Sequence, residues 1–206
     1  MKTTLLSLSL VGALLTVSLA AQDAPPAQAE REARAKVATG QRLAYANSAE
    51  YKPYDTTNRD FQKRASALLE KSDFAGAIAE CQKGLTAFKY DINLLIILAA
   101  AYRESGNLPN AEKTRQQWMS LVDSILDSGD GRDFASAFKV ITVEEEYAVL
   151  RVLGLRVMGQ ALVTHDGSQF DQMQVKEPKS GKELVLYFNI DLPLNWLNRQ
   201  FSKKSP

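Results

Sequence analysis

Residues 58–91 read NRDFQKRASALLEKSDFAGAIAECQKGLTAFKYD, and residues 92–125 read INLLIILAAAYRESGNLPNAEKTRQQWMSLVDSI. The second segment repeats the first at an offset of 34 residues. Residues of similar size or similar turn-forming character coincide at six places, namely Phe61 with Leu95, Ala65 with Ala99, Leu68 with Tyr102, Ser72 with Gly106, Phe74 with Leu108 and Ala77 with Ala111. Each segment has the pattern of one helical hairpin, so the pair predicts four antiparallel helices.

A period of 34 residues in this register is typical of tetratricopeptide (TPR) repeats. The small residues Ala65 and Ala77 allow the two helices of a hairpin to approach closely, and large apolar residues beside them fill the seam. Gly106 can end a helix in the left-handed conformation. The first segment departs from the pattern at Arg64, where leucine is usual. The sequence therefore predicts a TPR-like helical region of two repeats over residues 56–127.

The first fifty residues divide into three short segments. Residues 1–20 are typical of a secretory signal peptide, because Lys2 precedes an apolar run and Ser18 and Ala20 offer small side chains for cleavage before Ala21. A membrane anchor is the alternative, but the run is short for a bilayer and contains Ser and Thr. Residues 21–29, rich in Ala, Gln and Pro, predict a disordered leash. Residues 30–50 predict a helix, which Pro53 separates from the repeats.

Residues 132–201 predict a C-terminal α+β cap on the helices. Residues 137–142 suggest a short strand, and Thr142 with Glu145 forms a capping box at the start of a helix that ends at Gly154. Strand patterns follow at 155–164, 169–176 and 183–190, and a last helix is expected over 193–201. The predicted fold class is α+β, with TPR-like helical hairpins in two repeats followed by a small antiparallel sheet with one or two helices.

Composition narrows the choice of partners and compartment. The chain has 25 Lys and Arg against 24 Asp and Glu and no dense basic stretch, which argues against nucleic acid as a partner. Cys81 is the only cysteine, so no intramolecular disulfide can form. No stretch after the signal peptide is long and apolar enough to cross a bilayer. We therefore expect an exported protein, periplasmic or secreted, with no stable membrane anchor after signal cleavage.

The helix expected from Ile92 to Glu104 has almost no polar face, so it should be covered on all sides. By TPR register, the first helix of each repeat lines a concave groove. The groove residues predicted to bind are Arg59, Gln62, Lys63, Ser66, Asn93, Ile96, Ile97 and Arg103. A second candidate surface is the open face of the last strand, with Tyr187 and Asn189. Either the chain itself covers the groove, through its C-terminal part or the helix at 30–49, or a protein or peptide partner does.

Few residues suggest chemistry. His165 and Asp166 could act as a base with its orienting carboxylate and Ser168 as a nucleophile, but a tight turn explains them more simply. Helix capping explains the three glutamates at 144–146. The Gly-rich segment at 127–131 does not fit a calcium loop, because Leu126 and Ala137 would occupy ligand positions. The sequence contains no phosphate-binding loop, nucleophile elbow or Cys-x-x-Cys motif, so no cofactor and no metal are predicted.

A series of short motifs resembles an uncharacterised family of exported bacterial proteins that is known only as a domain of unknown function. The motifs, in order, are YKPYD at 51–55, LDSGDG at 126–131, VEEEY at 143–147, LGL at 153–155, GQAL at 159–162 and LYFNID at 186–191. The resemblance spans residues 42–201. It implies a bacterial, periplasmic protein with TPR-like helices followed by a small sheet. It implies no activity, so no catalytic residue is carried over.

Three functions are compatible with these observations. The preferred one is an exported interaction or scaffold module that binds a protein or peptide. The second is a hydrolase-type enzyme that uses Glu145, Tyr147, His165 or Asp191 in a site between the helical and β parts. An inhibitor or immunity protein for a secreted or envelope enzyme is the third. An enzyme should bring several of those side chains together in one pocket, whereas a scaffold should leave them apart.

Overall fold

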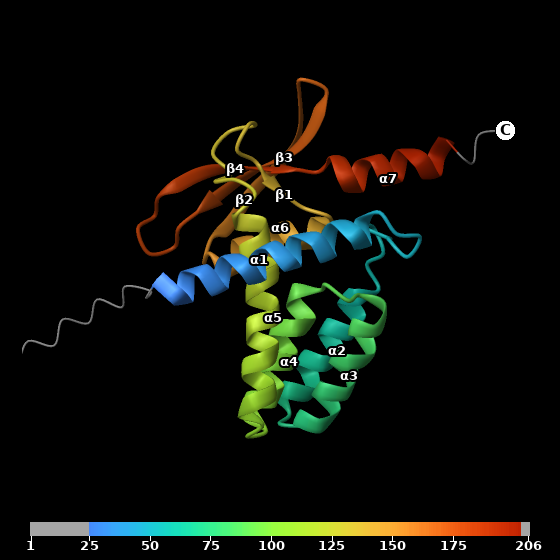
Figure 1. The fold of residues 1–206 in the computed structure, drawn as a ribbon, viewed down its shortest axis with the longest axis vertical. Coiled ribbons are helices and arrows are strands. Elements are labelled where there is room, and N and C mark those ends of the chain that lie inside the picture. Colours follow the sequence, from blue (N-terminus) through green and yellow to red (C-terminus); the bar gives the residue numbers. More distant parts are fainter. Residues whose placement is uncertain (1–24, 203–206) are drawn as a thin grey trace, which may run out of the picture.

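The computed structural model describes residues 25–202, and the predicted signal peptide at 1–20 lies outside them. The fold is α+β, with helices first and a sheet after them (Figure 1). The helical part contains α1 (Pro25–Ala46), α2 (Asn58–Glu70), α3 (Phe74–Ala87), α4 (Ile92–Glu104) and α5 (Leu108–Leu126). The C-terminal part contains β1 (Phe138–Lys139), α6 (Val143–Val152), β2 (Arg156–His165), β3 (Ser168–Lys176), β4 (Glu183–Asn189) and α7 (Asp191–Ser202).

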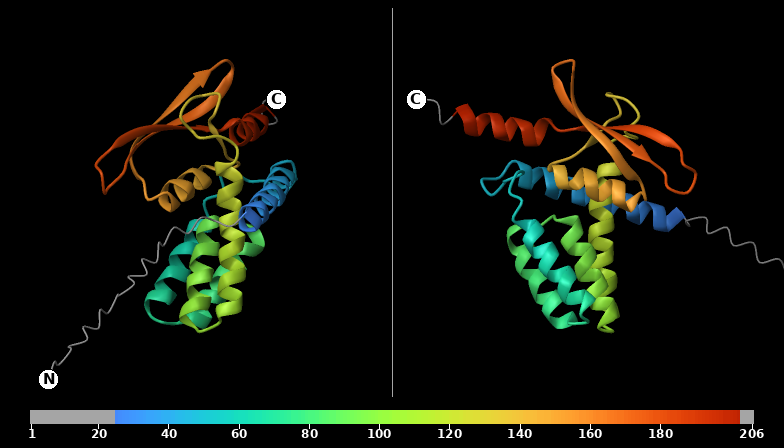
Figure 2. Two further views of the ribbon diagram at one scale, coloured as in Figure 1. Left: turned by 60° about the vertical axis from the view of Figure 1, so that its left-hand side comes forward. Right: turned by 180° about the vertical axis from the view of Figure 1, so that it is seen from behind.

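The four predicted helices are confirmed, since α2 to α5 lie side by side and each packs on the next (Figure 2). The 34-residue offset recurs in the turns. Ser72 after α2 and Gly106 after α4 both adopt positive φ, 60° and 81°. The next residues, Asp73 and Asn107, cap α3 and α5 through their side chains. The two hairpins therefore use the same turn and the same cap.

The structure corrects the predicted boundaries at the N-terminus. The leash predicted for residues 21–29 is wrong for residues 25–29, because α1 begins at Pro25. Proline is tolerated in the first turn of a helix, and the Ala, Gln and Glu residues that follow are strong helix formers. The helix predicted over 30–50 ends at Ala46, four residues early. Its buried residues Ala35 and Ala38 face α5, which it crosses at the end nearest the sheet (Figure 1).

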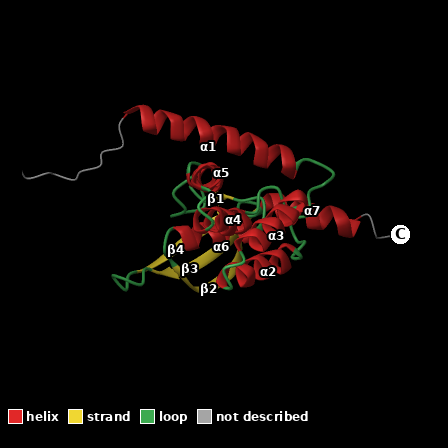
Figure 3. Ribbon diagram, turned by 90° about the horizontal axis from the view of Figure 1, so that it is seen from below, coloured by secondary structure: helices red, strands yellow, loops and turns green. Residues whose placement is uncertain are grey.

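The sheet has the strand order β1-β4-β3-β2. The predicted antiparallel arrangement is confirmed for β2, β3 and β4. The strand expected at 137–142 forms only β1, which pairs parallel with β4 through Phe138 opposite Phe188, so the sheet is mixed. The chain leaves the sheet early because Thr142 caps α6, accepting a hydrogen bond from the Glu145 amide. In the view from below, α1 lies along one side of the molecule and the strands lie on the other (Figure 3).

One hydrophobic core joins the helices to the sheet. Its buried members come from α1, α4, α5, α6, the strands and the residues beside them, and include Leu95, Ile125, Val149, Met173 and Phe188. Helix α6 lies between the sheet and the helical layer (Figure 2). On α4, Ile96 packs against this core, while Ile97 packs against a second cluster between the hairpins. The chain itself therefore covers the apolar helix α4.

A buried ion pair links the two parts of the fold. Arg42 of α1 donates from Nε and Nη2 to the carboxylate of Glu145 in α6, at 2.8 and 2.5 Å. Arg42 also donates to the Ser124 hydroxyl of α5 and to the Lys139 carbonyl of β1, each at 3.1 Å. The Ile141 amide donates to Glu145 at 2.8 Å. Both charged side chains are at most 4% exposed, so four segments meet at one satisfied charge pair.

Loss of the Arg42 guanidinium should destabilise the fold strongly. We expect Arg42→Ala to lower the free energy of unfolding by about 3–5 kcal/mol, because it leaves the Glu145 carboxylate buried without its counter-charge. The matched control is Arg34→Ala on the same helix, where an exposed pair with Glu30 should contribute less than about 1 kcal/mol. Urea unfolding measures both values. Equal effects of the two substitutions would contradict the structural role of Arg42.

The two equivalent turns should respond oppositely to substitution. Ser72→Gly should stabilise the protein by up to about 1 kcal/mol, because glycine adopts positive φ without the steric penalty of a side chain. Gly106→Ala should destabilise it by about 1 kcal/mol for the same reason. Thermal unfolding of the two variants tests this. Shifts of the same sign would show that the turns are not equivalent.

Candidate functional site

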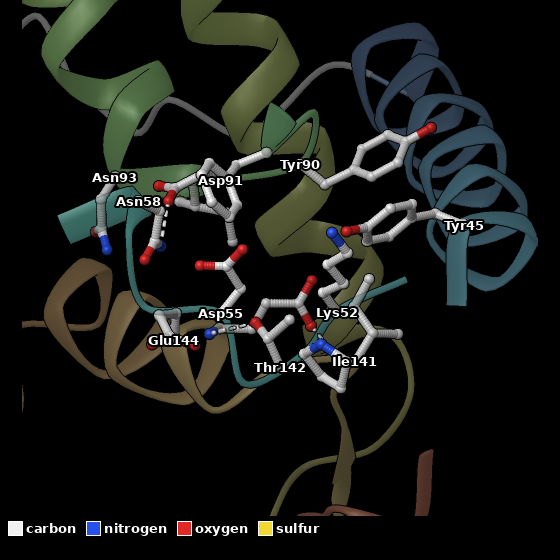
Figure 4. A pocket seen from close by; sticks show the side chains of 14 residues that line it. Tyr45, Lys52, Asp55, Asn58, Tyr90, Asp91, Asn93, Ile141, Thr142 and Glu144 are labelled. Carbon is white, nitrogen blue, oxygen red and sulfur yellow. Dashed lines mark hydrogen bonds between the residues drawn. The ribbon is translucent and has the colours of Figure 1, made fainter. Parts of the chain in front are cut away.

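A pocket lies where the loop after α1 meets the N-termini of α4 and α6 (Figure 4). Water-sized molecules can reach about 50 Å³ of it. Figure 4 shows Asn58, Asp91 and Asn93 on one side, Tyr45 and Lys52 on the other, and Asp55 between them. Thr142 and Glu144 at the start of α6 close another side. The pocket is thus assembled from three segments that are far apart in the sequence, residues 45–58, 88–93 and 141–145.

Local turn chemistry fixes the acidic side chains of this pocket. Asp55 accepts hydrogen bonds from the amide and the hydroxyl of Thr57, at 3.0 and 2.6 Å, and so shapes the entry to α2. Those hydrogen bonds hold the pKa of Asp55 below its ordinary value. Asp91 is the N-cap of α4 and accepts from the Leu94 amide at 2.9 Å. Glu144 in the first turn of α6 pairs with Arg59 at 3.0 Å.

Asp91 also sets the orientation of Asn58. Its carboxylate accepts from Asn58 Nδ2 at 2.6 Å and from Gln62 Nε2 at 2.8 Å. Because the Asn58 amide nitrogen must face the carboxylate, Oδ1 faces the other way. This oxygen has no hydrogen-bond partner among the described residues, although Asn58 is only 5% exposed. An unpaired buried acceptor costs roughly 1–3 kcal/mol, which a ligand that donates an N–H could recover.

A second polar cluster lies beneath the sheet. Glu146 of α6 is fully buried, and no described donor reaches its carboxyl oxygens, but its acid form can donate to the neighbouring Asp171 carboxylate. Burial, followed by the nearby charge of Asp171, raises the pKa of Glu146 to about 10. Burial also raises the pKa of Asp171, which accepts from Gln160 Nε2 at 2.8 Å. Tyr147 donates its hydroxyl to Gln160 Oε1 at 2.6 Å. Glu146 is therefore held as a neutral acid beside a carboxylate.

Comparison with protein-family models gives one assignment. The model described as "Domain of unknown function (DUF4919)" matches residues 41–199, which is most of the chain. The chain belongs to this family. The matched residues of the DUF4919 protein include the ion pair and both polar clusters. Comparisons with curated proteins and with solved structures give no match.

Among residues 25–202 of the DUF4919 protein, no group of three or more His, Cys, Asp or Glu side chains is arranged to hold a metal ion. None of the described helices combines the length and apolar character needed to cross a bilayer.

The predicted groove residues of the DUF4919 protein fall into two sets. Three lie at the pocket or bond to its lining. Asn93 lines it and accepts from Arg151 at 2.6 Å, while Arg59 and Gln62 bond to Glu144 and Asp91. The remaining five are placed elsewhere: Lys63 is exposed, Ser66 is half-buried, Ile96 and Ile97 pack in the two cores, and Arg103 pairs with Glu104.

The predicted sheet-face residues are partly covered. The Tyr187 ring packs against Phe134, with 4.6 Å between centroids, and Phe134 belongs to the loop that follows α5. Asn189 donates to the Asp191 carboxylate at 3.0 Å, where α7 begins. These contacts hold the loop and α7 against the end of the sheet.

The four residues of the enzyme hypothesis do not form one site. Glu145 is engaged with Arg42, and Tyr147 with Gln160. His165 sits at the β2–β3 turn, where its ring stacks on Phe134 at 4.2 Å. Asp191 accepts from the Gln169 amide at the start of α7. Each of the four side chains therefore has a different partner, and they do not share a pocket.

Sequence reasoning missed the residues that shape the two clusters. Asp55, Asn58 and Asp91 carried no signal beyond turn and cap formation. Asp171 did carry one, because it falls on the same strand face as Met173 and Val175, which are buried. A charged residue on an apolar face indicates a buried carboxylate.

Replacement of Glu146 should change the pH dependence of stability. Between pH 4.5, the ordinary pKa of the group, and about pH 10, the folded state keeps a proton that the unfolded state has lost. The free energy of unfolding should therefore fall as pH rises through this window, by at most about 1.4 kcal/mol per pH unit for this group. Glu146→Gln removes the titrating group, so the melting temperature of this variant should fall less between pH 5 and pH 9 than that of the wild-type protein. Equal pH slopes for wild type, Glu146→Gln and the exposed control Glu183→Gln would exclude a neutral Glu146.

Proposed function

We propose that this DUF4919 protein is an exported interaction module of the bacterial envelope that binds a protein or peptide partner at the pocket. The observation that supports this proposal most directly is the unpaired hydrogen-bond acceptor Asn58 Oδ1 in an acidic pocket. A folded protein that keeps a buried acceptor unpaired at a pocket wall is prepared for a ligand that supplies the donor.

The helical layer supports the choice of an interaction role. Its two hairpins repeat the same turn at Ser72 and Gly106 and the same cap at Asp73 and Asn107. We interpret this layer as TPR-like. Arrays of this kind are recognition surfaces, and two repeats alone are usually too few to be stable. Here α1, α6 and the sheet cover apolar surface that further repeats would cover in a longer array.

The envelope location is proposed from the N-terminal sequence. Lys2, the apolar run after it and the small residues Ser18 and Ala20 form the pattern of a cleavable signal. Mass spectrometry of the protein recovered from the periplasm of a bacterial host should show a chain that begins at Ala21. An uncleaved chain that stays in the cytoplasm would overturn this part of the proposal.

Site-specific photo-crosslinking in living cells tests the interaction role. A photoreactive amino acid in place of Lys52, which is exposed at the pocket rim, should yield a discrete crosslinked partner. The control replaces Lys179, which is exposed in the turn between β3 and β4, and should not yield that product. The same product from both positions, or none from Lys52, would contradict a binding site at the pocket.

A hydrolase is the second candidate, because of the Glu146 and Asp171 pair. Hydrolases that use acid–base catalysis combine a neutral carboxylic acid with a second carboxyl group. Glu146, however, is fully enclosed, so a substrate would reach it only after α6 and the sheet separate. The pocket needs no such rearrangement, and we therefore place the binding role first.

A further inference from the structure

We propose that the pocket takes the charged end of a lysine or arginine side chain from a protein partner, with Asn58 Oδ1 as acceptor for one of its N–H groups. This inference rests on the proposed binding role and names the chemistry of the ligand.

The first requirement that the pocket sets is a hydrogen-bond donor. Asn58 cannot turn its amide over, because Oδ1 would then face the Asp91 carboxylate at the 2.6 Å now spanned by an N–H···O bond. The unpaired oxygen is therefore a fixed acceptor. A carboxylate ligand has no proton to offer it at neutral pH.

The second requirement is positive charge. Four carboxylates line the pocket, but Glu144 is balanced by Arg59 and Glu145 by Arg42. Asp55 and Asp91 have no such partner among the described residues, and Lys52, which is exposed, is the cationic side chain of the lining. The pocket therefore carries an excess of carboxylates, which favours an ammonium or guanidinium group over a neutral hydroxyl or amide.

The third requirement is an alkyl stem. Tyr45, Phe88, Tyr90 and Ile92 give the pocket an apolar wall, and the rings of Tyr45 and Tyr90 lie 5.5 Å apart. Lysine and arginine pack their methylene groups along such a wall while the charged head reaches polar groups. A cation near tyrosine faces gains further attraction. A bare metal ion would leave this wall unused.

The size of the pocket indicates that only the end of the ligand enters. About 50 Å³ is accessible, which is room for a few water molecules or one cationic head group with part of its stem. The rest of the ligand must remain outside, against the surface formed by the loop at 47–57 and by α6. A side chain that projects from a larger partner meets this condition.

Titration of the mature chain, followed by NMR, tests the proposal with four probes. These are the N-acetyl methylamides of lysine, arginine and norleucine, and free butylamine. The lysine or arginine probe should shift the backbone amide signals of Asn58, Asp91 and Leu94, and norleucine, which has the stem without the charge, should not. Equal shifts with norleucine, or no shift at these amides with either basic probe, would overturn the proposal. If butylamine binds as tightly as the amino-acid probes, the pocket selects a small amine and not a side chain of a protein. That result would overturn the assignment of a protein partner.

Two variants complete the test. Asn58→Leu removes the acceptor, and Asp55→Asn removes one charge while its side-chain oxygen can still accept from Thr57. Each should weaken binding of the basic probe about tenfold or more, the range expected for a hydrogen bond or contact with a charged group. Asn47→Ala, at an exposed asparagine outside the pocket lining, should leave it unchanged. Unchanged affinity in a folded Asp55→Asn variant would overturn the proposal even if Asn58→Leu failed to fold. A crosslinked partner at Lys52, together with no preference for the basic probes, would support the proposed binding role. It would overturn only the proposal that the ligand is cationic.

Discussion

The ion pair between Arg42 and Glu145 is the contact on which the arrangement of this fold depends. Residues from α1, α5, the β1 segment and α6 all contribute hydrogen bonds to it. A buried ion pair of this kind adds little stability compared with a well-packed apolar pair. Its two side chains must nevertheless stay together, because either charge alone would be buried without its counter-charge. It therefore fixes where α6 begins relative to the helical layer.

The position of α6 in turn determines the two polar clusters. Consecutive residues of a helix point about 100° apart, so the glutamates at 144–146 face three directions. Glu144 faces the pocket, Glu145 meets Arg42, and Glu146 lies beneath the sheet beside Asp171. One turn of helix thus connects the pocket, the ion pair and the buried acid. A shift of α6 by one residue would disrupt all three.

The local features of this structure could be predicted from the sequence. The 34-residue offset predicted four helices, the apolar pattern gave the bounds of α4, and the spacing of Thr142 and Glu145 predicted the start of α6. These features depend on residues within one or two helical turns. Arg42 and Glu145 are 103 positions apart, and nothing local distinguishes that arginine from its exposed neighbours. The parallel pairing of β1 and the pocket built from three distant segments are also long-range, so they appeared only in the folded chain.

Hydrogen–deuterium exchange over the whole chain tests most directly whether the ion pair unites α1, α6 and the helical layer. If it does, the amides around Arg42 in α1 should exchange as slowly as those of the buried segments of α5 and α6, and all three should lose protection together when Arg42 is replaced. Fast exchange of α1 in the wild-type protein, with α5 and α6 still protected, would show that α1 is an independent arm. In that case Arg42 would not be what holds the pocket in place.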